Sequence, residues 1–166
     1  KLATGELIGT LAMNEGLGSP SVAARVLEGK LTANKIPVPD GDIADFTVLT
    51  AVDEQGCIGL HLVDLADAGV QRKTLTSMDP SRSQARLVFD NVPVQALGVA
   101  GETQLTELLD RAAVLLAFEQ IGGCQAALDM GIAYTKERYA FGRAIASFQA
   151  IKHKFADMYV ALELAR

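Results

Sequence analysis

A long helical stretch is the feature that most limits what this chain can fold into. Residues 103–137 contain no proline and are rich in Leu, Ala, Glu and Gln, which all favour helix. The apolar residues form two stripes: Leu105, Leu108, Leu109, Ala112, Leu115 and Leu116 make the first, and Val114, Phe118, Ile121, Leu128 and Ile132 the second. A helix that is apolar on more than one side cannot be covered by a single neighbour. We therefore expect partner helices after residue 166 or on another subunit, and interpret the chain as a piece of a longer protein.

A short basic and aromatic segment, residues 138–149, interrupts the helical pattern. After it, apolar residues return at helical spacing and predict an amphipathic second helix over 147–166. Gly142 frees the backbone for a turn, and Arg138 and Arg143 add two cations to a segment made mostly of small and aromatic residues. We interpret this segment as a corner between two helices.

The first hundred residues group into short β-favouring runs separated by turn residues. The expected strands are 7–13, 23–27, 46–52, 57–63 and 85–89, and the expected breaks are 16–20, 28–30, 37–42, 53–56 and 78–83. No pattern of helix length separates the strands, which favours an antiparallel β-domain over a βαβ fold. The sequence thus predicts an α+β chain, with a β-domain over 1–99 and the first helices of an incomplete up-down bundle over 100–166.

Composition and charge argue against several classes of function. The formal net charge of −5 and the pI near 5.0 give no general attraction to nucleic acid or to an anionic membrane surface. Cys57 and Cys124 are far apart in sequence, and His61 and His153 have no metal-ligand partner at suitable spacing, so we expect neither a disulfide framework nor a metal site. The chain has no long uncharged apolar run and no signal peptide, which predicts a cytoplasmic protein.

The corner carries a motif that resembles the acyl-CoA dehydrogenase family. Members of that family have, in the helical domain after their β-domain, an Arg, two variable residues, Phe-Gly, a basic residue and, shortly afterwards, Phe-Gln. The matching residues here are Arg138, Phe141, Gly142, Arg143, Phe148 and Gln149. The resemblance implies an N-terminal helical domain, a middle β-domain and a C-terminal four-helix domain, of which this chain matches the second and the start of the third.

A first family segment in the β-domain implies contacts with FAD. There the family has Thr-Glu-Pro, two residues and Gly-Ser, which line the flavin and the thioester. Residues 13–19 resemble this motif, one residue shorter, with Asn14 in place of the Thr and Ser19 matching the Ser. Amides, hydroxyls and backbone N–H groups can bond the pyrimidine side of a flavin. The resemblance therefore implies that Asn14 and Ser19 contact the cofactor.

A second family segment, Gly-Thr-Lys followed by Trp-Ile-Thr-Asn, is altered at its centre. Residues 31–41 fall in register with it. Pro37 stands where the family has the Trp that packs on the flavin, and Pro39 stands where it has the Thr whose hydroxyl approaches the reactive nitrogen. Proline offers no aromatic face, no hydroxyl and no N–H. This departure argues against flavin binding by the β-domain of this subunit itself.

The resemblance also implies contacts in the helical half. Arg138 matches the Arg that reaches the pyrophosphate of a flavin held mainly by the neighbouring subunit, and Phe141 and Gln149 match residues along the same cofactor. A guanidinium suits a pyrophosphate because its donor fork meets two oxygens at once. Asp110 matches an Asp that contacts acyl-CoA. The alternatives are a solvated helix-end arginine, a core phenylalanine and an acid favoured at a helix start.

No residue of this chain is nominated as catalytic. The family removes the α-proton of an acyl thioester with a carboxylate and transfers the β-hydride to FAD. In most members the base is a Glu that would lie beyond residue 166, and in a minority it lies where this chain has Ala112. Glu119, two turns later, is interpreted as a packing or surface acid.

Three functions stay open at this point. The first is a subunit of an acyl-CoA dehydrogenase of fatty acid or steroid degradation that lends Arg138, Phe141 and Gln149 to a flavin in a catalytically complete subunit, as the likeness to divergent subunits of actinobacterial heteromeric enzymes implies. The second is a non-enzymatic assembly or interaction protein that keeps the fold. The third is an ordinary flavin-binding homo-oligomer, and an oxidase of the same fold is not separated from a dehydrogenase. The implied partners are acyl-CoA, another subunit of the family in a homo- or hetero-oligomer, and an electron-transfer flavoprotein as acceptor.

Overall fold

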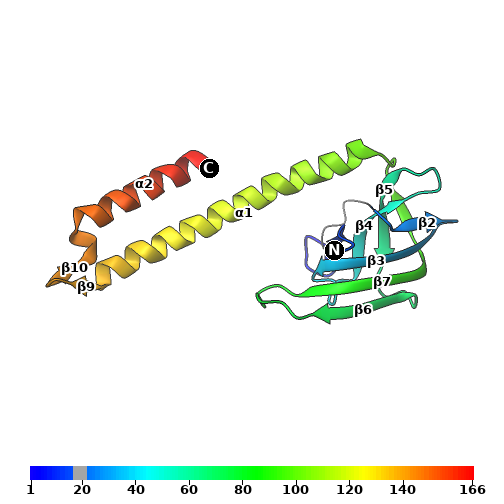
Figure 1. Cartoon of the computed structure of the whole chain (residues 1–166), viewed down its shortest axis with the longest axis horizontal. Coiled ribbons are helices and arrows are strands. Elements are labelled where there is room, and N and C mark those ends of the chain that lie inside the picture. The colour runs from blue at the N-terminus through cyan, green and yellow to red at the C-terminus, as the bar shows by residue number, and fades with distance from the viewer. Residues whose placement is uncertain (17–21) are drawn as a thin grey trace. The chain divides into compact units, whose positions relative to one another are not determined.

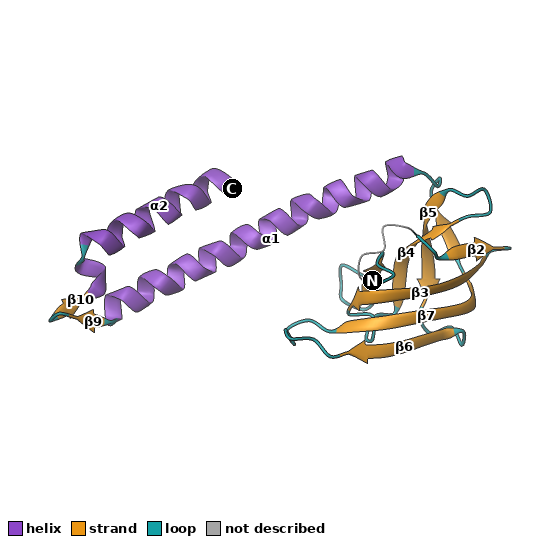
Figure 2. Ribbon diagram, in the orientation of Figure 1, coloured by secondary structure: helices purple, strands orange, loops and turns teal. Residues whose placement is uncertain are grey.

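The chain divides into a sheet-bearing unit and a helical unit. The computed structural model describes residues 1–16 and 22–166. Its two compact units are residues 1–107 and 108–166. The first holds a β-sheet and the second a hairpin of two helices (Figures 1 and 2). Helix α1 (Glu102–Glu137) begins in the first unit and runs on through the second.

Eight strands of the described residues form one sheet. They are β1 (Gly9–Ala12), β2 (Arg25–Leu27), β3 (Lys30–Pro39), β4 (Phe46–Val52), β5 (Ile58–Asp64), β6 (Val70–Leu75), β7 (Gln84–Pro93) and β8 (Gln95–Leu97). Their order across the sheet is β6-β7-β3-β2-β4-β5-β8, and β1 pairs with β4 off this path. The predicted α+β class is confirmed. Most neighbours are antiparallel as expected, but β1 and β2 each run parallel to β4, which corrects the expectation of a purely antiparallel sheet.

The sequence located some strands and missed others. Strand β4 has the predicted bounds, and β1, β2, β5 and β7 overlap predicted strands with shifted ends, whereas β3, β6 and β8 lie outside them. The expected break over 37–42 is wrong at its start, because β3 continues to Pro39. Strand β3 tolerates proline because its register with β7 shifts between Lys35 and Val38, and Pro37, which follows a cis peptide bond, falls inside that shift.

The sheet encloses a hydrophobic core within its own unit. Side chains alternate between buried and exposed along β3 and β7, as expected for strands with one face on a core. The buried cluster comprises Ala12, Ala24, Val26, Leu31, Ala33, Val38, Ala44, Leu49, Ala51, Val63, Leu65, Ala85, Leu87, Phe89 and Val92. Lys35 occupies an inward position of β3 in line with Leu31 and Ala33, and its side chain is fully buried. A charged residue at such a position requires polar partners.

The helical unit contains two helices and a corner. After α1 come β9 (Tyr139–Ala140), β10 (Arg143–Ala144), a 3-10 turn η1 (Ile145–Ser147) and α2 (Gln149–Ala165). The predicted second helix is confirmed, with its start two residues later than expected. It returns beside α1, where Arg166 donates a hydrogen bond to Gln125 at 3.1 Å and the Phe155 ring lies against Gly131. Among the described residues of this unit only Leu128, Thr135 and Leu162 are buried. No helix of the described chain is long and apolar enough to cross a membrane.

Candidate functional site: the corner between the helices

A two-residue turn forms the tip of the corner. Strands β9 and β10 pair antiparallel, with Arg143 opposite Ala140 and Ala144 opposite Tyr139. The turn between them consists of Phe141 and Gly142, which both have positive φ, of 54° and 77°. Two consecutive positive φ angles are typical of the tight hairpin turn that matches strand twist. Gly142 adopts this conformation readily, and Phe141 pays a steric cost to project from the tip.

Backbone hydrogen bonds close the corner on both sides. The N–H of Arg138 donates to Tyr134 O at 2.9 Å, which continues the last turn of α1. The N–H of Ile145 donates to Arg138 O at 2.8 Å, which closes the hairpin, and Ser147 Oγ donates to Ala144 O at 2.7 Å. These bonds fix the backbone that carries Arg138 by contacts within the unit. The predicted corner is therefore an ordered structure with its own hydrogen bonds.

Aromatic contacts hold the tip against the start of α2. The rings of Phe141 and Phe148 meet edge to face with centroids 6.3 Å apart. The Arg143 guanidinium lies 4.0 Å from the centroid of the Phe148 ring, a cation–π contact. Phe141 nevertheless keeps 96% of its surface exposed. The corner thus positions a large apolar ring while leaving it open to another molecule.

The polar groups of the corner are also available. Arg138 and Gln149 are exposed, and within the described part of the chain the Arg138 guanidinium takes part in no hydrogen bond or ion pair. Phe148 is the N-cap residue of α2, and no side chain caps this end. The first amides of a helix have no acceptor within the helix and form the positive end of its dipole. An exposed guanidinium and a helix N-terminus each favour an anionic group.

The β-domain candidates lie apart from the corner in sequence and in unit. Asn14 is exposed, and its carbonyl accepts a hydrogen bond from Ile36 N at 2.8 Å, which brings it beside the strand segment that carries Pro37. Ser19 lies outside the described residues. Pro37 and Pro39 are both exposed, and Pro39 O accepts a hydrogen bond from the Thr10 hydroxyl. This surface therefore offers proline rings where the family resemblance implies a Trp and a Thr.

Asp110 does not belong to the corner. It is an exposed residue near the start of the second unit, on α1. At a rise of about 1.5 Å per residue it lies roughly 40 Å along the helix axis from Arg138. The structure thus keeps the candidate for acyl-CoA separate from the candidates for the cofactor.

The sequence analysis missed a buried ion pair beside Asn14. Lys35 Nζ lies 2.6 Å from Glu15 Oε1, and the two side chains are 0% and 8% exposed. Burial lowers the pKa of Lys35, against the hydrogen bond and charge of Glu15. Burial raises the pKa of Glu15, but hydrogen bonds from Lys35, Ala23 and Ala24 outweigh it and leave that pKa lowered. The burial of Lys35, though not its partner, could have been predicted, because Leu31, Ala33 and Lys35 share the inward face of one strand.

His61 is another buried polar residue without an assigned role. It lies on β5 as expected, is 4% exposed, and neither ring nitrogen has a hydrogen-bond partner among the described residues. It borders a cavity of about 300 Å³ together with Gly59, Asp53 and Ala100. Burial lowers its pKa, against the charge of Asp53. No group of three potential metal ligands occurs in the described chain.

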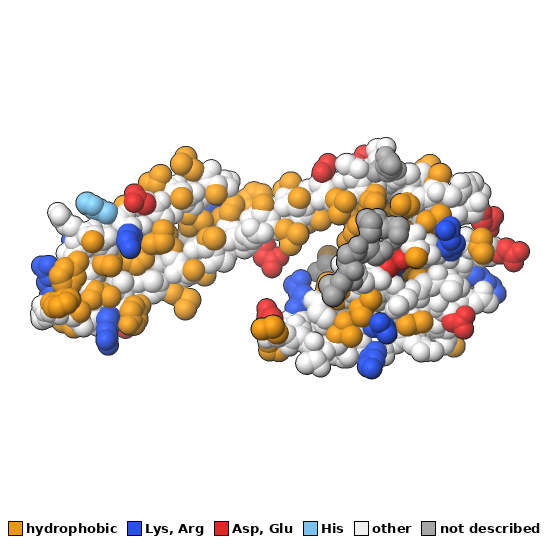
Figure 3. All heavy atoms as spheres, in the orientation of Figure 1, with side chains coloured by type: hydrophobic (Ala, Val, Ile, Leu, Met, Phe, Trp, Pro, Cys, Tyr) orange, Lys and Arg blue, Asp and Glu red, His pale blue; other side chains and the backbone are white. Residues whose placement is uncertain are grey.

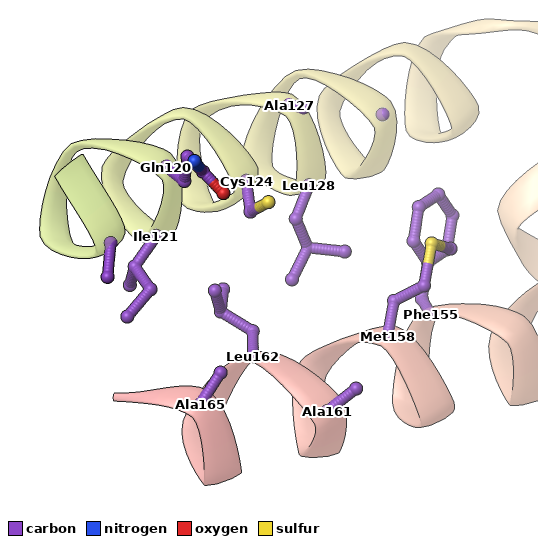
Figure 4. Close-up of a pocket in the computed structure, with 12 residues that line it drawn as sticks. Gln120, Ile121, Cys124, Ala127, Leu128, Phe155, Met158, Ala161, Leu162 and Ala165 are labelled. Carbon is purple, nitrogen blue, oxygen red and sulfur yellow. The ribbon is translucent and has the colours of Figure 1, made fainter. Parts of the chain in front are cut away.

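A wide apolar groove separates α1 from α2. Its volume is about 800 Å³, and its lining side chains project toward each other from the two helices (Figure 4). The lining residues are Ala117, Gln120, Ile121, Cys124, Ala127, Leu128, Gly131, Phe155, Met158, Ala161, Leu162 and Ala165. Hydrophobic side chains also lie along the outer surface of both helices (Figure 3). This groove agrees with the expectation that the helices need further partners.

Comparisons with known proteins identify relatives of both units. Residues 100–166 match the family model of the acyl-CoA dehydrogenase C-terminal domain. Acyl-CoA dehydrogenase IpdE2 of Mycobacterium tuberculosis is 36% identical over 140 residues, which cover 83% of this chain and 38% of that protein. The chain therefore spans less than half the length of such a relative.

Solved structures give the same result for the fold. A glutaryl-CoA dehydrogenase from Mycobacterium smegmatis in complex with FADH2 is similar over 99% of this chain and 46% of its own, with a TM-score of 0.84 and 24% identity. The ChsE4-ChsE5 complex from Mycobacterium tuberculosis is similar over 96% of this chain and 44% of its own, with a TM-score of 0.81 and 26% identity. With the sheet unit, the helical hairpin and the Arg138–Gln149 corner, these matches show that the chain belongs to the acyl-CoA dehydrogenase family of FAD-dependent oxidoreductases.

Proposed function

We propose that the parent protein is a subunit of an acyl-CoA dehydrogenase that performs the α,β-dehydrogenation of an acyl-CoA thioester. In this proposal the chain lends its corner to an FAD seated mainly in a neighbouring, catalytically complete subunit. FAD, when bound, supplies the acceptor for the hydride that leaves the β-carbon. The residues of this chain bind and orient the cofactor and carry no proton in the reaction.

The corner is the observation that carries the proposal. Its backbone is fixed by hydrogen bonds within the unit, yet Arg138, Phe141 and Gln149 are all exposed. A free guanidinium can bind two oxygens of a pyrophosphate at once, and the uncapped start of α2 adds a positive potential. Phe141, 96% exposed, offers an apolar face to the same molecule. These groups therefore fit the phosphate-bearing part of FAD.

The β-domain fits the flavin less well. Pro37 and Pro39 are exposed on β3 and supply neither a ring to stack on the flavin nor a hydroxyl to bond it. Asn14 is exposed and can still donate a hydrogen bond. Ala112 stands where a minority of the family has its base. This combination supports a non-catalytic subunit in a heteromeric enzyme, and the ChsE4-ChsE5 complex is one of the assemblies to which the chain is similar in fold.

The substrate and electron acceptor follow from the same proposal. An acyl-CoA thioester of a fatty acid or a steroid side chain would be dehydrogenated, with Asp110 as a contact to acyl-CoA and an electron-transfer flavoprotein as acceptor. Asp110 is exposed, as such a contact requires. The base belongs to another part of the assembly.

A non-enzymatic assembly protein is the second candidate. The apolar groove and the exposed apolar side chains of both helices favour it, because they require partners whether or not a flavin is present. The two candidates differ on one point, namely whether Arg138 contacts a cofactor.

The first test is the visible absorption spectrum of the full-length parent, alone and together with any subunit encoded beside it. A colourless protein that joins a yellow assembly, at about half a flavin per chain, supports the proposal. A yellow protein with about one flavin per chain when purified alone indicates a conventional flavin-binding homo-oligomer. An assembly that stays colourless indicates the non-enzymatic candidate.

Substitution of Arg138 tests the contact itself. We expect Arg138→Ala in the full assembly to weaken FAD binding about ten- to hundredfold, because a charge-assisted pair is lost. Lys154→Ala is the matched control, since it removes an exposed cation from α2 away from the corner. Unchanged flavin content and turnover in Arg138→Ala would show that the corner does not hold the cofactor.

A further inference from the structure

We propose that Lys35 is a positioning residue that, through Glu15, holds the Asn14 segment against strand β3, where the family resemblance implies that Asn14 contacts the cofactor. This inference rests on the proposed function, because it concerns the place of Asn14 in that function. Lys35 makes no contact with the site itself. It acts through the carboxylate of Glu15 and the backbone on either side of it.

Lys35 occupies a position that normally takes an apolar side chain. It points inward from β3 in line with Leu31 and Ala33, and it is fully buried. Its ammonium donates to Glu15 Oε1 at 2.6 Å and to the carbonyl oxygen of Thr50 at 2.7 Å, so it joins the segment before β2 to strand β4. Longer contacts reach Thr50 Oγ1 at 3.3 Å and Met13 O at 3.5 Å. A buried ammonium is retained only where such acceptors surround it.

Glu15 carries this attachment to the backbone amides of two consecutive residues, Ala23 and Ala24. Its Oε2 accepts a hydrogen bond from Ala23 N at 2.7 Å, and its Oε1 accepts one from Ala24 N at 3.2 Å. The carboxylate thus ties together backbone that lies eight residues apart in the chain. Its position is fixed in turn by Lys35, so removal of the ammonium would release both attachments.

The same attachment determines where Asn14 lies. Ile36, the neighbour of Lys35, donates its N–H to Asn14 O at 2.8 Å, and Glu15 forms a parallel bridge with Ile36. Asn14 therefore precedes the anchored carboxylate and lies against the residue that follows the ammonium. Because the ion pair and the backbone bridge both involve Glu15 and adjacent residues of β3, loss of the pair should loosen the bridge as well.

Amide hydrogen exchange in the full-length parent within its natural assembly tests the positioning directly. We expect Glu15→Gln to speed exchange at Ala23, Ala24 and Ile36 by about tenfold or more, while amides of β4 and β5 keep their rates. Arg82→Gln is the control, since Arg82 forms an exposed pair with Asp40 at 3.8 Å. Equal acceleration throughout the sheet, or none at the three amides, would overturn the proposal.

A double substitution separates positioning from simple core stability. Glu15→Met with Lys35→Met removes both charges and keeps similar volume, so the melting temperature should stay near that of the unaltered protein. We expect the FAD dissociation constant of the assembly, or the KM for acyl-CoA, to rise about three- to tenfold with little change in kcat. Values within twofold of the unaltered assembly would show that the pair serves the core alone.

The experiments distinguish failure of this inference from failure of the proposed function. A colourless unaltered assembly would overturn that function, while the exchange rates of Ala23, Ala24 and Ile36 would still show whether Lys35 positions the segment. A yellow assembly whose three amides do not respond to Glu15→Gln would leave the function in place and refute the role of Lys35.

Discussion

The two units differ in how much of their apolar surface they bury within the chain. The sheet unit encloses a continuous cluster that includes Leu31, Leu49 and Phe89, each at most 1% exposed. In the helical unit only Leu128, Thr135 and Leu162 are buried among the described residues, and most of its large apolar side chains are exposed. The first unit therefore holds itself together through its own core. The second depends on neighbours for the burial that would stabilise it.

The strongest test of this contrast is a large-to-small substitution in each unit. Phe89→Ala in the sheet core should lower the free energy of unfolding by about 3–5 kcal/mol, because a buried ring is replaced by a cavity. Leu164→Ala on α2, where the side chain is 83% exposed, should change it by less than about 0.5 kcal/mol. Urea denaturation of the full-length parent measures both. A loss from Leu164→Ala as large as that from Phe89→Ala would break the comparison.

The next effect comes from the charged pair inside the sheet unit. Glu15→Gln should cost about 2–3 kcal/mol near neutral pH, because a hydrogen bond between charged groups is lost in a buried place. The pKa of Glu15 is lowered in the folded state, so its stabilisation is present above pH 4.5 and disappears as pH falls through the folded pKa. Denaturation curves of the two proteins should therefore converge in acid. A difference in unfolding free energy between the two proteins that stays constant down to low pH would contradict this.

An exposed apolar residue of α1 tests the dependence of the helical unit on neighbours. Leu115 is 71% exposed in this chain. Leu115→Ser should leave unfolding of the chain nearly unchanged but weaken subunit association by about 1.5–3 kcal/mol if the side chain is buried in the assembly. Sedimentation velocity across a dilution series measures it, with Thr106→Ser, an exposed polar change on the same helix, as control. If Leu115→Ser leaves the dissociation constant of the subunits unchanged, another side of α1 contacts the partner.

His61 is a buried side chain of the sheet unit whose ring nitrogens have no hydrogen-bond partner among the described residues. His61→Leu should raise the free energy of unfolding by about 1 kcal/mol, because two unpartnered ring nitrogens are removed from a buried site. The pKa of His61 is lowered by burial, so the folded state of the natural protein should lose stability as pH falls below 6.5, and the variant should lose less. His153→Gln on the exposed face of α2 is the control. Destabilisation by His61→Leu at neutral pH would indicate a bound water or ligand at the ring.

These results also show which features the sequence could predict. Strand β4 was found because a β-favouring apolar run lies between clear turn signals, and the helices because their spacing is regular. Strand β3 was missed because Pro37 normally ends a strand, whereas the register shift that accommodates it depends on pairing with β7. The parallel pairing of β1 and β2 with β4 depends on the tertiary fold, and no local sequence pattern predicts it.

The candidate residues likewise include some that the sequence could predict and some that it could not. The corner was predictable because Arg138, Phe141 and Gln149 lie within one short segment, so their spacing alone brings them together. The pairing of Lys35 with Glu15 was not, because twenty residues separate them and only the fold makes the ammonium meet the carboxylate. A sequence motif predicts how residues close together in the chain are arranged. The partner of a buried charge depends instead on which distant segments pack together in the fold.

The smallest effects concern two surface arginines, one in each unit. Arg82 lies 3.8 Å from Asp40, and Arg166 contacts Glu163 at 3.0 Å and Gln125 at 3.1 Å, all with exposed or half-exposed side chains. Surface pairs contribute about 0–1 kcal/mol, so Arg82→Gln should have no measurable effect and Arg166→Gln should cost at most about 0.5 kcal/mol. Thermal denaturation at low and high salt measures both, since screening should remove what little the pairs contribute. The bond from Arg166 to Gln125 joins α2 to α1, so a larger, salt-resistant loss there would mean that the hairpin is held by its own polar contacts. The helical unit would then depend less on neighbouring helices than its exposed apolar surface implies.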